Sequence, residues 1–145
     1  MTDRDRTPAQ IYSLVFGAVL LLAGILGFFA DSSFGDLGSD VNGDELIIFE
    51  VNGWHNLVHI ASGLLGLALM NSASGARAYA LGFGTVYLLV TIWGIVDGND
   101  VLGILPVNGA DNVLHIAIAA TGILAGLLSS PDRTTAGRTR GATSA

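Results

Sequence analysis

Histidine and asparagine recur at helical spacing in the segment 52–59, which reads Asn-Gly-Trp-His-Asn-Leu-Val-His. The polar residues lie three or four positions apart, so in a helix they share one face. Lipid offers no partner to such groups, and this face should therefore point into the protein if the segment crosses a membrane. A second segment, 108–115, repeats the pattern. The polar cluster comprises Asn52, His55, Asn56, His59, Asn108, Asp111, Asn112 and His115.

A metal ion is one chemical use of this face. Imidazole nitrogens and carboxylate oxygens are common zinc ligands, and two residues four apart on a helix can reach one ion. His55 and His59 have this spacing, and Asp111 and His115 hold the equivalent positions in the second segment. The candidate metal ligands are therefore His55, His59, Asp111 and His115.

Two further interpretations remain open. In the first, which we favour, the cluster is structural: Asn52 and Asn108 cap helices, and His59 and His115 hydrogen-bond Asn56, Asn112 or the segments that precede the helices. In the second, His59 and His115 are the axial ligands of a b-type haem beside a glycine-rich helix face. Binding of a substrate or lipid headgroup at an acidic outer mouth is a remaining alternative.

Other chemistry finds little support. The chain has no cysteine, so it can form neither a disulfide nor a thiolate site. It contains no phosphate-binding glycine loop, no Gly-x-Ser-x-Gly and no His-Glu-x-x-His. No nucleophile beside an acid–base pair is visible, and no basic patch for nucleic acid. We therefore favour a non-enzymatic role and expect no nucleic-acid partner.

The chain contains an internal repeat. Shifting it by 56 positions places 44–66 on 100–122, where eleven of 23 residues are identical, including Asn52/Asn108, Asn56/Asn112 and His59/His115. Shifting it by 67 places 12–27 on 79–94, with nine of 16 identical. The difference of 11 residues corresponds to an insertion near 31–43. These matches predict two tandem copies of one helical hairpin, related by an axis along the membrane normal.

Four apolar stretches are long enough, or nearly so, to cross a bilayer, which takes about 20 residues. They cover roughly 11–30, 54–70, 79–96 and 113–128. Only 12% of the residues are charged, about half the fraction of a soluble domain. The first stretch begins with Thr7-Pro8-Ala9-Gln10, which is typical of a capped helix start.

The charges are segregated along the chain. All six basic residues are arginines in 4–6, at 77 and in 133–140, whereas nine of the 12 acidic residues lie in 31–50 and 97–111. The positive-inside rule places the arginine side in the cytoplasm. We expect residues 1–10 as a cytoplasmic N-terminus, 11–130 as one membrane domain with repeats at 11–70 and 78–128, and 131–145 as a disordered cytoplasmic tail.

The stretch Asn52–Gly63 and its altered copy Asn108–Gly122 resemble the bacterial membrane proteins of the domain of unknown function 4383 family, found largely in actinobacteria. The resemblance covers roughly Pro8–Ser130. Asn52, His55, Asn56 and His59 match the family's N-x-x-H-N-x-x-H motif, but Asp111 replaces the first histidine in the second copy. The resemblance implies a plasma membrane location and four helices, and it implies no activity.

The prediction is an all-α, polytopic membrane protein: a four-transmembrane-helix bundle of two tandem helical hairpins with both termini cytoplasmic. We expect a small protein without enzymatic activity, in which the histidine–asparagine cluster organises the outer half of the bundle. The alternative is a redox or sensor protein that binds a metal ion or haem b. The lipid bilayer is the expected partner, and a homo-oligomer remains open.

Overall fold

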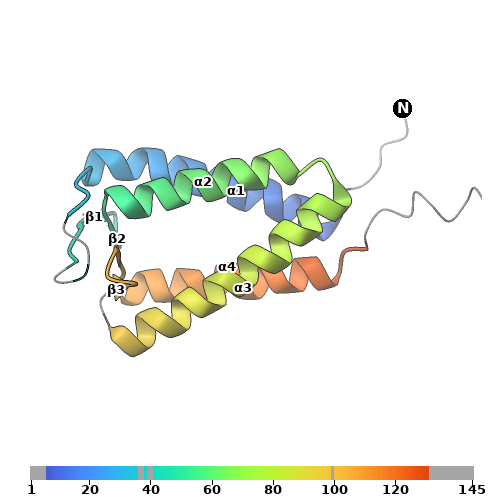
Figure 1. The fold of residues 1–145 in the computed structure, drawn as a ribbon. Coiled ribbons are helices and arrows are strands. Elements are labelled where there is room, and N and C mark those ends of the chain that lie inside the picture. The colour runs from blue at the N-terminus through green and yellow to red at the C-terminus, as the bar shows by residue number, and fades with distance from the viewer. Residues whose placement is uncertain (1–5, 36–37, 39–40, 99, 131–145) are drawn as a thin grey trace, which may run out of the picture.

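Four helices run along one long axis in the computed structural model, which describes residues 6–35, 38, 41–98 and 100–130 (Figure 1). They are α1 (Pro8–Ala30), α2 (Gly53–Leu69), α3 (Ala73–Asp97) and α4 (Gly109–Leu127). The predicted all-α class and the four helices are confirmed. The predicted tail 131–145 and the arginines 4, 133, 138 and 140 lie outside the described residues.

Each helix start has a side-chain cap. Thr7 and Gln10 form the predicted capping box, with Pro8 in the first turn of α1. The Asn52 side chain accepts from His55 N at the start of α2, and Asn108 does the same for Ala110 N and Asp111 N in α4. These side chains satisfy backbone donors that a helix start leaves without partners, which matters most where water is scarce.

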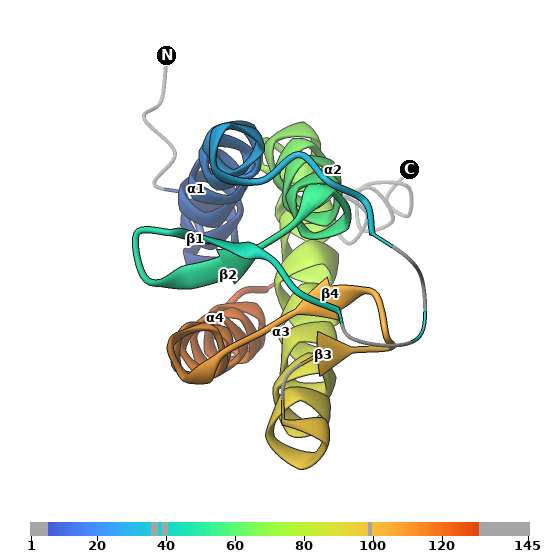
Figure 2. The same ribbon diagram turned by 90° about the vertical axis from the view of Figure 1, so that its left-hand side faces the viewer.

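Short β-hairpins precede α2 and α4. The first pairs β1 (Asp44–Leu46) with β2 (Phe49–Val51), and the second pairs β3 (Asp100–Val101) with β4 (Leu105–Pro106). Both lie at the same end of the bundle and cross over the helix ends (Figure 2). The segments that precede α2 and α4 are therefore hydrogen-bonded ladders.

Three of the described helices are long and apolar enough to cross a membrane: α1, α4 and residues Ala73–Val96 of α3. Their outward faces are apolar, as lipid requires; Leu22, Leu89 and Leu127 are each more than half exposed. Helix α2 has 17 residues, or about 25 Å at 1.5 Å per residue, slightly less than the ~30 Å hydrocarbon core.

Small residues and tyrosines form the interior away from the hairpins. The buried core contains Tyr12, Tyr79 and Tyr87 together with alanines and Ile118. Tyr12 Oη donates to Ile118 O at 3.1 Å, and Tyr79 Oη donates to Ser62 O at 3.1 Å. These two bonds join residues that are equivalent under the sequence shifts of 67 and 56. They tie α1 to α4 and α3 to α2.

Candidate metal centre

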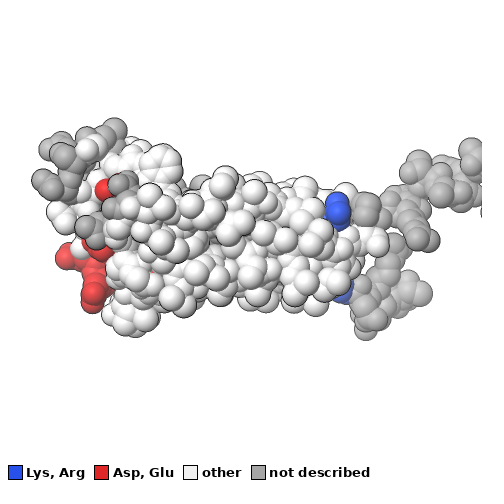
Figure 3. All heavy atoms as spheres, turned by 90° about the horizontal axis from the view of Figure 1, so that it is seen from below, with Lys and Arg blue, Asp and Glu red and all other residues white. Residues whose placement is uncertain are grey.

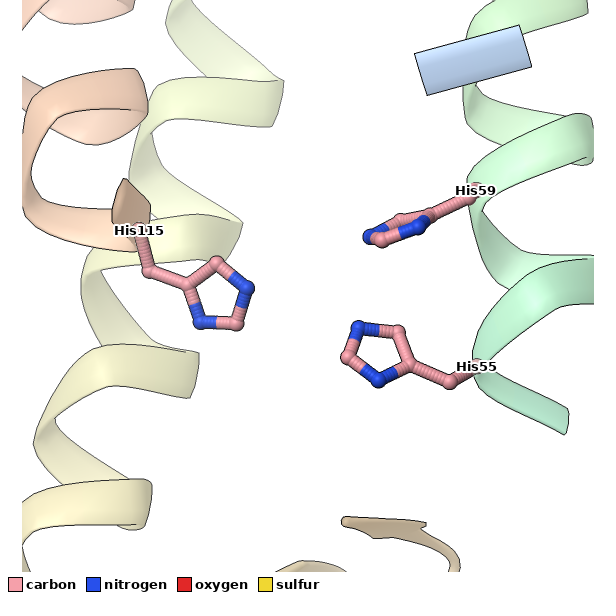
Figure 4. A group of neighbouring side chains, drawn as sticks. All are labelled: His55, His59 and His115. Atoms are coloured by element: carbon pink, nitrogen blue, oxygen red, sulfur yellow. The ribbon is translucent and has the colours of Figure 1, made fainter. Parts of the chain in front are cut away.

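The three histidines of the chain meet inside the hairpin end of the bundle. His55 and His59 project from α2 and His115 projects from α4, and the three rings face one another (Figure 4). One ring nitrogen from each residue can be chosen so that all three lie within 4.8 Å of one another. All three residues are at most 9% exposed. All three histidines were among the four metal ligands predicted from the sequence, and the structure brings them together.

The spacing suits a small coordination sphere. Zn–N bonds of about 2.0–2.1 Å at tetrahedral angles place ligand nitrogens about 3.3 Å apart. Nitrogens within 4.8 Å can reach that separation through small side-chain rotations. The His55 and His59 ring centroids are 4.4 Å apart, and those of His55 and His115 are 6.3 Å apart.

The Nδ1 atoms of His55, His59 and His115 are buried, and none has a hydrogen-bond partner among the described residues. Burying such a group without a partner costs about 1–3 kcal/mol. Three such atoms in one cluster are therefore unfavourable for a purely structural network. Coordination of an ion by these nitrogens would give them a partner and remove this cost.

Neighbouring groups hold the rings in place. The backbone of Glu50 in β2 and of Pro106 in β4 lies close to the His55 ring. Tyr87 of α3 packs edge-on against His115, with ring centroids 4.9 Å apart and planes at 83°. Backbone carbonyls commonly fix the orientation of metal-binding histidines in this way.

Asp111 lies beside the cluster but has a different set of partners. Its Oδ2 accepts from Glu50 N and from Asn108 N, each at 3.0 Å. These bonds close the capping box of α4 and attach β2 to that helix. The structure therefore brings together three of the four predicted ligands and gives Asp111 Oδ2 to backbone donors.

The asparagines divide into two pairs with different surroundings. Asn52 Nδ2 donates to Ile104 O at 3.0 Å, and Asn108 Nδ2 donates to Ile48 O at 2.9 Å. Each cap thus also binds the β-hairpin that precedes the other cap. We call this reciprocal pair of bonds the asparagine clasp.

Asn56 and Asn112 face their own helical hairpins. Asn56 donates to Asp31 O at 2.7 Å and packs against Gly27 of α1, whereas Asn112 packs against Gly94 of α3. Sequence analysis expected these asparagines as partners of the histidines. Their contacts instead lie toward α1 and α3, at positions where only a glycine leaves enough space.

Acidic groups surround the outside of the cluster. Glu50 is partly buried in β2, and its Oε1 accepts from Gly43 N. Burial raises the pKa of the Glu50 carboxyl, and the charges of Asp111 and Glu45 raise it further, while the Gly43 bond opposes them. Negative charge at this end would attract cations.

The family can be stated once this geometry is clear. Residues 10–128 match the family model described as domain of unknown function (DUF4383). The chain belongs to this family. No curated protein and no solved structure matches it significantly. The description of the DUF4383 family names no activity.

Proposed function

We propose that the protein is a four-span membrane protein that binds one divalent transition-metal ion through His55, His59 and His115. The observation that carries the proposal is the buried group of ring nitrogens within 4.8 Å of one another. Borderline metals such as Zn²⁺, Co²⁺ and Cu²⁺ suit an all-imidazole set. In this proposal the asparagines organise the outer half of the bundle, and the histidines supply the binding site.

A b-type haem fits this site less well. The cavity beside the histidines measures about 120 Å³, whereas ligand pockets usually measure about 300–1,000 Å³. A porphyrin between His59 and His115 would also have to displace His55, whose ring lies 6.3 Å from that of His115. The observed spacing favours a single ion over a macrocycle.

Metal analysis of the detergent-purified protein tests the proposal. We expect about one equivalent of Zn²⁺ or Co²⁺ in the wild type and none in the His59→Ala/His115→Ala variant. Cobalt is informative because its visible bands are intense in tetrahedral sites. An Asn56→Ala variant serves as a control, since Asn56 is equally buried but contacts α1. No metal in the wild type after loading would leave the cluster as structural packing.

We also propose that α2 crosses the membrane with the other three helices, as two tandem hairpins with both termini cytoplasmic in the plasma membrane. Support comes from charge: Arg6 and Arg77 lie at one end, and the described acidic side chains gather at the other (Figure 3). Further support comes from the paired bonds at equivalent residues, namely the asparagine clasp and the two tyrosine bonds.

Cysteine labelling tests this topology, because the native chain has no cysteine. Ser33 is exposed at the hairpin end, and Ser74 is exposed in the first turn of α3 at the other end. In intact cells, an impermeant maleimide should label Ser33→Cys and leave Ser74→Cys unmodified until the membrane is permeabilised. The opposite result would invert the topology, and labelling of both would refute four spans.

A further inference from the structure

The cavity beside the histidines extends the proposed metal site. It measures about 120 Å³ and lies between α1, α4 and the β1–β2 hairpin. Its wall is apolar apart from three residues: His59, Asp111 and His115. Two of the three proposed ligands therefore border an otherwise hydrophobic space.

Away from His59, Asp111 and His115, the wall of this space offers water no polar partner. Water needs two to four polar partners, and cavities of about 150 Å³ lined by Leu, Ile and Phe stay dry while binding small apolar molecules. The lining here includes Phe16, Leu20, Phe49 and Ile118. The apolar part of the wall favours a small uncharged molecule, whereas an anion would have to give up its hydration to pass through it.

Access to this space runs from the lipid side. Val19 and Leu114 line the cavity and are 53% and 37% exposed on the outer faces of α1 and α4. Those faces lie on helices that are apolar enough to span the membrane. A molecule dissolved in the hydrocarbon layer can reach the cavity there without crossing the acidic hairpin end.

Three imidazole ligands leave a metal ion with an open coordination position, as in catalytic zinc sites. We infer that this position opens into the mostly apolar cavity and takes a small, uncharged, lipid-soluble ligand. The inference rests on the proposed metal site. It assigns to that site a class of ligand and a route by which the ligand arrives from the membrane. The ligand only coordinates the ion, and no covalent or redox step is proposed.

Carbon monoxide on the Cu(I)-loaded protein is a direct probe, since the C–O stretch reports binding to the ion. Ala23→Phe places an aromatic ring at a residue that lines the cavity. Ala18→Phe is the matched control, because Ala18 is exposed on the same helix and does not line the cavity. We expect a carbonyl band in the wild type and in Ala18→Phe, and at least a tenfold weaker band in Ala23→Phe at equal copper content.

The outcomes separate this inference from the metal site itself. Copper that binds stoichiometrically but gives no carbonyl band in the wild type would overturn the inference and leave the metal site standing. An equal band in Ala23→Phe would show that the ligand approaches by another route, which also overturns it. Failure to bind copper at all would refute the metal site first. Azide on the Cu(II) form should give little spectral change, and tight azide binding would contradict the uncharged class.

Discussion

Replacing His115 with alanine should weaken Co²⁺ affinity by more than about 100-fold, because even changes outside the direct ligands of a metal cost 10- to 100-fold. His115 is the single ligand contributed by α4, so its loss leaves two imidazoles on one helix. His55→Ala and His59→Ala should have effects of the same order. Competition titration against a chelator of known affinity measures the change.

The Asp111→Asn variant tests whether Asp111 is also a metal ligand. The Asp111 carboxylate accepts two backbone N–H groups through Oδ2, and an asparagine oxygen can still accept there. We expect Co²⁺ affinity to stay within a few fold of the wild type. A loss as large as that of His115→Ala would show that Asp111 is a fourth ligand, as the sequence pattern first suggested. Melting temperatures of all variants separate loss of the site from loss of the fold.

Gly63→Ala should cause a large loss of stability, because Gly63 packs directly against the backbone of α1. A Cβ at Gly63 would lie 2.5 Å from Leu21 N and 2.7 Å from Gly17 O, both backbone atoms of α1. Backbone cannot move aside as a flexible side chain can, so α1 and α2 must separate. Overpacking of this kind costs about 1–3 kcal/mol, occasionally more.

Gly82→Ala provides the matched control for this prediction. A Cβ at Gly82 in α3 would meet nothing within 4 Å, so the added methyl should stabilise the helix by about 0.5–1 kcal/mol. Unfolding titrations in mixed micelles measure both variants. The position equivalent to Gly63 in the second copy is Ala119. Equal stability of the two variants would mean that α1 and α2 can move apart at little cost, which would contradict the prediction.

Helix positions could be predicted because their signals are local. Thr7, Pro8 and Gln10 mark the start of α1 in both sequence and structure, and the predicted spans 54–70 and 113–128 differ from α2 and α4 by one to four residues. The start of α3 was missed: it begins at Ala73, whereas the predicted span began at 79. Its first turns are small and polar, so hydropathy alone does not include them.

The site was predictable only in part. The spacing of polar residues shows which of them share a helix face, but it does not show which groups on other elements they contact. The i, i+4 pair His55 and His59 and the repeat-equivalent His115 could be selected from sequence. The hydrogen bond from Glu50 N to Asp111 Oδ2 depends on the β1–β2 hairpin. The turn of this hairpin has Ile47 at a φ of 67°. A β-branched residue rarely adopts a positive φ, and turns of this kind usually have glycine or asparagine at that position. The sequence therefore did not predict the hairpin. The reciprocal acceptors of Asn52 and Asn108 likewise depend on how the two halves pack.

The asparagine clasp has a consequence for biogenesis. Helices α1 and α2 leave the ribosome first, but the acceptor of Asn52 is Ile104 O, and Ile48 O receives its donor from Asn108. The first half therefore cannot complete its outer end until residues 100–108 have been synthesised and translocated. Until α4 follows them, His55 and His59 face no third imidazole. Completion of the hairpin end and of the proposed histidine site therefore both wait for the second half of the chain.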